Sequence, residues 1–101
     1  MLDKATAMNL ACQYAQVVKK AVNPDSIVFF GSFINGTPHE NSDIDIAVIK
    51  NNFYGEYFEV SQLLHKLRRD ISADISPILL DLNHDPSGFA AEVMRTGLII
   101  G

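Results

Sequence analysis

The sequence has few basic residues, a single cysteine and no long apolar run, and each shortage excludes a class of protein. Eight lysines and arginines stand against twelve acidic residues, for a net charge of −4. This balance argues against a protein that grips nucleic acid over its whole surface. Cys12 cannot form an intrachain disulfide, and its place beside apolar helix positions predicts a buried thiol. Because no run reaches the roughly eighteen apolar residues of a membrane span, and no signal-peptide pattern is present, we expect a cytoplasmic protein.

The composition and periodicity predict one globular domain over residues 1–101. Hydrophobic content of 48% and charged content of 20% are typical of a folded chain. Apolar residues recur at helical spacing over residues 3–22, 54–70 and about 86–95. Runs at 26–31, 43–49 and 73–80 predict strands, and 98–100 could add a short fourth. Pro77 lacks a backbone donor, so we expect the third strand at an edge or a bulge.

The first strand ends in a glycine-serine turn. The apolar run before Gly31 stops where glycine lets the backbone turn sharply and approach a ligand closely. Ser32 adds a hydroxyl at the start of a predicted helical turn, where free backbone N–H groups attract phosphate. The turn is therefore a candidate phosphate-binding element.

Two aspartates open the second strand. Side chains alternate along a strand, so Asp43 and Asp45 should project from one face, roughly 6.5–7 Å apart at their Cα atoms. Like charges this close repel each other, and a divalent cation between them relieves the repulsion. The pair predicts a magnesium site that is presented by a strand whose other face is buried.

Ordinary explanations remain open for each feature taken alone. A Gly-Ser pair can be a simple turn, an Asp-x-Asp can be a solvated strand edge, and Asp74 can be a solvated acid at the start of the third strand. The three histidines, His39, His65 and His84, have no metal-ligand spacing to one another. We therefore interpret them as a loop residue, a helix surface residue and a turn residue.

Together, the motifs resemble a known family. Gly31-Ser32, ten intervening residues and Asp43-x-Asp45 are similar to the signature of the polymerase-beta-like nucleotidyltransferase superfamily. The short chain, Gly36 and Ser42 point to its minimal members. The resemblance implies an α/β (α+β) fold, in which a small mixed sheet of three to four strands packs against helices on one side. Ile34 and Asn35 depart from the pattern, because a small residue and a basic residue often stand there.

The resemblance also implies roles for particular residues. The nucleotide would be held by Gly31, Ser32, Gly36 and Ser42. Asp43 and Asp45 would hold two Mg²⁺ ions, and a third carboxylate would complete a catalytic triad. Asp74 matches that third position best, ahead of Asp70 and Asp81, and would bind the catalytic Mg²⁺ and help to take the proton of the acceptor.

The activity implied by the resemblance is transfer of AMP from ATP to an acceptor hydroxyl. The acceptor would be a tyrosine of a helical HEPN-type partner, in a pair that behaves as antitoxin and toxin. Two alternatives stay open: an antitoxin that acts by binding with little or no catalysis, and a small α/β interaction domain with an incidental Asp-x-Asp. A homodimer is also compatible with the small size, while direct nucleic-acid binding is not expected.

Overall fold

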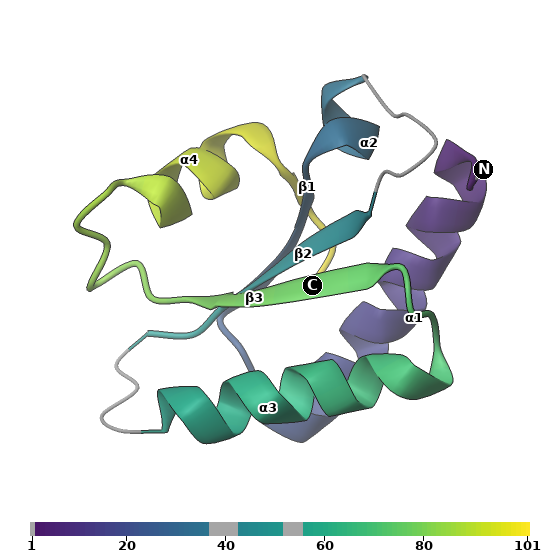
Figure 1. Ribbon diagram of the computed structural model, residues 1–101. Coiled ribbons are helices and arrows are strands. Elements are labelled where there is room, and N and C mark those ends of the chain that lie inside the picture. Colours follow the sequence, from purple (N-terminus) through teal and green to yellow (C-terminus); the bar gives the residue numbers. More distant parts are fainter. Residues whose placement is uncertain (1, 37–42, 52–55) are drawn as a thin grey trace.

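The computed structural model describes residues 2–36, 43–51 and 56–101 (Figure 1). Along the chain the elements are α1 (Lys4–Val22), β1 (Ser26–Phe30), α2 (Ser32–Asn35), β2 (Ile44–Ile49), α3 (Tyr57–Leu67), a 3-10 turn (Arg68–Asp70), β3 (Ile75–Leu80), α4 (Phe89–Thr96) and β4 (Leu98–Ile99). This order confirms the expected alternation of helices and strands. The last helix begins later than expected because Gly88, with φ +77°, sets its start.

The four strands form one mixed sheet in the order β3-β2-β1-β4. β1 pairs antiparallel with both β2 and β4, whereas β2 and β3 run parallel. A parallel pair needs a crossover, and α3 supplies it between β2 and β3. Pro77 lies in β3, at the edge of the sheet, which confirms the prediction from its missing N–H.

Helices cover both faces of the sheet, which corrects the expectation of helices on one side. α1 and α3 pack against one face, and Figure 1 shows α4 across the other. The reason is that the two central strands bury both of their faces. Alternate residues such as Val28, Ala47 and Ile49 point away from α1 and pack against Val93 of α4.

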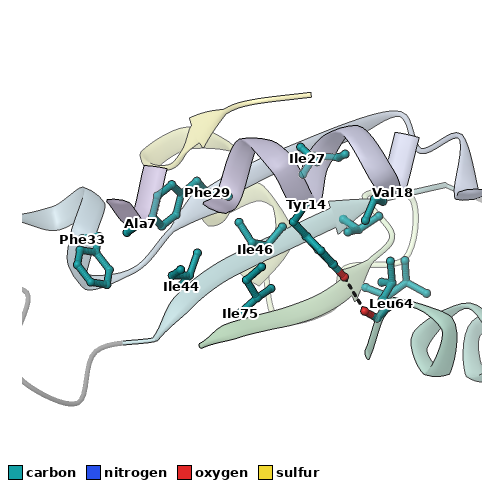
Figure 2. Close-up of a cluster of buried hydrophobic side chains, with 14 residues drawn as sticks. Ala7, Tyr14, Val18, Ile27, Phe29, Phe33, Ile44, Ile46, Leu64 and Ile75 are labelled. Carbon is teal, nitrogen blue, oxygen red and sulfur yellow. Dashed lines mark hydrogen bonds between the residues drawn. The ribbon is translucent and has the colours of Figure 1, made fainter. Parts of the chain in front are cut away.

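A buried tyrosine ties the two helices of the larger core together. Tyr14 of α1 is fully buried, and its hydroxyl donates a 2.8 Å hydrogen bond to the carbonyl oxygen of Leu64 in α3 (Figure 2). Burial raises the pKa of Tyr14 well above its ordinary value, an effect that the nearby Arg68 charge only partly offsets. The hydroxyl therefore keeps its proton and remains a donor.

Cys12 is exposed, contrary to the expectation of a buried thiol. The buried stripe of α1 consists of Ala7, Ala11, Tyr14, Ala15 and Val18. Cys12 follows Ala11 by one residue, and one residue rotates about 100° around a helix. Its side chain therefore turns out of the stripe toward solvent.

In the described ranges, no helix is both long enough and apolar enough to span a membrane.

Candidate active site

Asp45, the second residue of β2, pairs with Phe30 of β1 and lies on the sheet face that α4 covers. Asp43 immediately precedes the strand. Asp43 is exposed, whereas Asp45 is partly buried. Burial, and then the negative charge of Asp43, raises the pKa of Asp45. No lysine or arginine of the described residues forms an ion pair with either carboxylate.

Gly31 brings the end of β1 into direct contact with Asp45. Its backbone, at φ +91° and ψ −159°, lies in a region that essentially only glycine adopts. A Cβ at this position would overlap Oδ2 of Asp45 and lie 3.1 Å from its Cγ. Glycine is therefore required twice, for its conformation and for the space that the carboxylate occupies.

The turn after Gly31 continues into the four-residue helix α2. Ser32 begins this helix, and Gly36 ends it at φ +81° with its N–H bonded to the Ser32 carbonyl. The structure thus places Gly31 and Ser32 beside the carboxylate pair, with Gly36 one helical turn away. Ser42 and His39 lie outside the described residues, so the expectations for them stay predictions.

The sheet register distinguishes the three candidates for a third carboxylate. Ile75 pairs with Ile44, and the Ile44 N–H donates to the Asp74 carbonyl at 2.8 Å, so Asp74 stands next to Asp43. Asp81 follows the last residue of β3, about 20 Å further along the strand at its usual rise. Asp70 lies in the exposed 3-10 turn after α3. Only Asp74 shares the end of the sheet where Asp43 and Asp45 lie.

Arg68 anchors the backbone on both sides of Asp74. Its Nη1 donates to the carbonyl oxygens of Ala73, at 2.8 Å, and Ile75, at 3.1 Å. Ser72 adds to this by accepting a 3.0 Å hydrogen bond from the Asp74 N–H. Sequence analysis did not assign Arg68 this role; the available signal was a long cationic side chain at the junction of a helix and the next strand.

Asp43 and Asp74 line a shared hollow of about 150 Å³ at this end of the sheet. The hollow is also lined by His65, Arg68, Ala73, Ile75 and Ser76. His65 is exposed, as expected for the polar side of its helix, and it faces the hollow from α3.

The carboxylate pair fits a hard divalent cation that retains ligands from water or phosphate. Mg²⁺ is usually bound through one or two carboxylates together with substrate phosphates. Asp43 and Asp45 form no ion pair with a lysine or arginine of the described residues, and burial, followed by the charge of Asp43, raises the pKa of Asp45. Within residues 2–36, 43–51 and 56–101, however, no three acidic, histidine or cysteine side chains are arranged to hold a metal. The expectation that Asp74 also binds a metal ion stays a prediction.

A larger pocket, of about 620 Å³, lies at the opposite end of β3. Tyr57 and Phe89 line it together with the acids Asp81 and Asp85. Both acids bond to backbone N–H groups: Asp81 accepts from Asn83, and Asp85 accepts from the first turn of α4. These carboxylates serve the loop and the helix cap, so we place the candidate active site at the Asp43 end.

A mixed sheet that sets a glycine turn against paired aspartates on the next strand is the architecture of a nucleotidyltransferase. Comparison with family models agrees, because the family "Polymerase beta, Nucleotidyltransferase" matches residues 13–101. The chain belongs to this family.

Two similar proteins extend the comparison. A protein of Methanocaldococcus jannaschii named "Putative protein adenylyltransferase" is 32% identical over 90 residues, which cover 79% of this chain. The match spans 58% of the length of that relative. The crystal structure of "a putative nucleotidyltransferase" from Sulfolobus solfataricus superposes with a TM-score of 0.68 at 20% identity, over 95% of this chain and 80% of the other. At that identity, the superposition establishes the shared fold.

Proposed function

We propose that this chain transfers AMP from ATP to a hydroxyl group of an acceptor protein. The family supports nucleotidyl transfer in general, and the name of the M. jannaschii relative supports adenylylation of a protein. One observation carries the proposal: neither Asp43 nor Asp45 forms an ion pair with a lysine or arginine of the described residues, and Asp45 lies against the glycine turn at the end of β1.

In the proposed reaction, the role of each residue follows from its position on the sheet. The turn at Gly31 and Ser32 would hold the outer phosphates, with Gly36 and Ser42 at the border of the nucleotide site. Asp43 and Asp45 would hold two Mg²⁺ ions, which neutralise phosphate charge and lower the pKa of a bound hydroxyl. Asp74, beside Asp43, would orient the acceptor hydroxyl and help to take its proton.

The bond changes of the proposed reaction balance. The acceptor oxygen forms a bond to the α-phosphorus of ATP, and the bond from that phosphorus to the oxygen bridging the α- and β-phosphates breaks. Pyrophosphate leaves with the electron pair of the broken bond, and the proton of the acceptor passes through Asp74 to solvent. No histidine is required as a base, because a metal-bound hydroxyl loses its proton more easily.

For the acceptor, we propose a tyrosine of a helical HEPN-type partner. This part of the proposal follows from the resemblance to minimal nucleotidyltransferases.

Label transfer tests the proposal. The chain is incubated with α-labelled ATP, Mg²⁺ and the candidate partner, and we expect label on the partner that EDTA abolishes. The double variant Asp43→Asn with Asp45→Asn should lose transfer, and Lys19→Glu, on α1 away from the site, is the control. Absence of label with the unmodified chain, or label that survives in the double variant, would overturn the proposal. If the double variant still suppresses the toxicity of its partner, the chain acts by binding rather than by catalysis.

A further inference from the structure

The outer face of α3 carries a groove that leads to the carboxylates. The groove encloses about 630 Å³ and is lined by Phe58, Ser61, Gln62, His65, Lys66 and Arg69. His65 also lines the hollow that contains Asp43 and Asp74. One side chain thus borders both spaces, and a segment lying along α3 would reach the candidate active site.

The groove concentrates positive charge on an otherwise acidic chain. Lys66 and Arg69 line the groove and no acidic residue of the described ranges does, whereas the net charge of the protein is −4. Lys66 and Arg69 are exposed, and neither forms an ion pair among the described residues. Uncompensated cations at one place on an acidic surface favour a partner that brings negative charge to that place.

The groove also presents an apolar anchor point. Phe58 is 67% exposed, which is the largest exposure among the big hydrophobic side chains of the described residues. An exposed aromatic ring on the same helix face as exposed cations is typical of a protein interface, where a buried anchor supplies affinity and charges supply orientation. Nucleic acid is a weaker fit, because only two exposed cations line the groove.

The position of the groove matches the path of an acceptor, an inference that rests on the proposed function. The proposed phosphate turn lies at β1, on one side of β2, whereas β3 lies on the other side. In phosphoryl transfer the attacking and leaving oxygens are roughly in line. With the pyrophosphate held on the β1 side, the acceptor hydroxyl would approach from the β3 side, where His65 and Asp74 line the hollow.

We propose that an acidic segment of the acceptor protein docks along the α3 groove between Phe58 and Arg69. Its negative side chains pair with Lys66 and Arg69, an apolar side chain covers Phe58, and the acceptor hydroxyl reaches the hollow beside Asp74. The groove thus selects acceptors by charge, separately from the nucleotide site.

The first experiment measures docking without nucleotide. The ¹⁵N-labelled chain is titrated with two synthetic peptides that each contain one tyrosine and one leucine, flanked by glutamates in one peptide and by lysines in the other. We expect the glutamate peptide to shift the amide resonances of residues 58–69, and to bind at least about tenfold more tightly than the lysine peptide.

Charge reversal identifies the surface. Lys66→Glu with Arg69→Glu should weaken binding of the glutamate peptide by about tenfold or more, because two attractive contacts become repulsive. The matched control is Lys19→Glu with Lys20→Glu, which makes the same charge change at exposed positions of α1 and should alter binding less than about twofold. Phe58→Ser should weaken binding without changing charge.

Three results would overturn the docking proposal: equal losses in the two double variants, equal affinity for the two peptides, or shifts confined to another surface. An oligouridylate that binds the groove more tightly than the glutamate peptide would assign the surface to nucleic acid and overturn it as well. Because binding is measured without ATP, the outcome is separate from catalysis. Transfer of label to a partner with no docking in the groove would leave the proposed function standing, and docking with no transfer to any acceptor would remove only the proposed function.

Discussion

Gly31 and Asp45 are in direct contact, with no space between them for a methyl group. The contact joins the end of β1 to the start of β2, where the two strands pair through Phe30 and Asp45. The position of the proposed phosphate turn is therefore coupled to the position of a proposed metal ligand. A change at Gly31 should disturb both.

Gly31→Ala should destabilise the chain and weaken nucleotide binding. The alanine would be strained at φ +91° and would push the Asp45 side chain away, for a cost of about 1–3 kcal/mol. Urea unfolding measures the first effect, and thermal stabilisation by Mg²⁺-ATP measures the second. Gly88→Ala is the control, because Gly88 also has positive φ but has open space around it. It should cost some stability and leave nucleotide binding intact. Equal nucleotide binding by the Gly31 variant would contradict the coupling.

Asp45→Asn should make the fold more stable at neutral pH. The pKa of Asp45 is raised in the folded chain, so the folded state holds the proton more tightly than the unfolded state does. The resulting stability is complete below the ordinary pKa of 3.8 and is lost as pH rises through the folded-state pKa. Asparagine carries no charge and avoids that loss. The Asp45→Asn variant should therefore have the larger free energy of unfolding near pH 7, and the difference from the unmodified chain should shrink as pH falls toward 3.8.

Urea unfolding at a series of pH values measures this difference. Asp3→Asn provides a control of opposite sign, because hydrogen bonds from Thr6 lower the pKa of Asp3. The ionised Asp3 side chain stabilises the folded chain at neutral pH, and this stabilisation is lost as the carboxylate is protonated in acid. The Asp3→Asn variant should therefore be less stable than the unmodified chain at neutral pH. Despite its greater stability, Asp45→Asn should reduce transfer about a hundredfold or more. A less stable Asp45→Asn variant at pH 7 would contradict the assignment of an uncompensated charge.

Asp74→Asn should impair transfer, whereas Asp81→Asn should not. Asp74 stands beside Asp43 through the pairing of Ile44 with Ile75, while Asp81 lies at the far end of β3. We expect a loss of about a hundredfold for Asp74→Asn if it handles the acceptor proton. The rate of label transfer at saturating Mg²⁺-ATP is measured for both variants. The reverse ranking would show that the sheet register does not identify the third carboxylate.

Tyr14→Phe should cost about 1–2 kcal/mol of unfolding free energy, the usual price of a buried hydrogen bond. The variant leaves the Leu64 carbonyl without its partner from α1. Because the pKa of Tyr14 is raised, the unmodified chain should lose stability as pH rises above 10.0 and the unfolded tyrosine ionises. The difference in free energy of unfolding between the unmodified chain and Tyr14→Phe should then become smaller. Urea titrations at pH 7 and above pH 10.0 test both statements, and an unchanged gap would argue against a buried, protonated Tyr14.

Cys12 should react with a maleimide in the folded protein. The side chain is exposed on α1, so its rate of reaction should be within about threefold of that of the unfolded chain in urea. Mass spectrometry at timed intervals measures the rate, with Cys12→Ser as the blank. Protection until unfolding would restore the prediction of a buried thiol.

Local sequence patterns were sufficient to predict the helices and strands and part of the candidate site. The glycine stop at residue 31 and the missing donor of Pro77 are properties of short segments, and the structure bears both out as geometry. Asp45 lies in β2 and Asp43 one residue before it, so the shared face of the two carboxylates stays a prediction. Helical periodicity misplaced Cys12, because a position beside the buried stripe differs from a position in it by one residue. The packing of α4 on the second face of the sheet was also missed. Strands that are buried on both faces show no alternation of apolar and polar residues in the sequence.

The sequence alone determined the order of elements and which residues could bind phosphate or metal, because backbone freedom and side-chain chemistry are local. Only the tertiary structure decided which of them meet. The parallel register of β2 and β3 brings Asp74 to Asp43 and carries Asp81 away, and packing of α3 brings Arg68 to the carbonyls that flank Asp74. Those relations depend on contacts between distant segments, whose geometry is settled by the packing of the whole core.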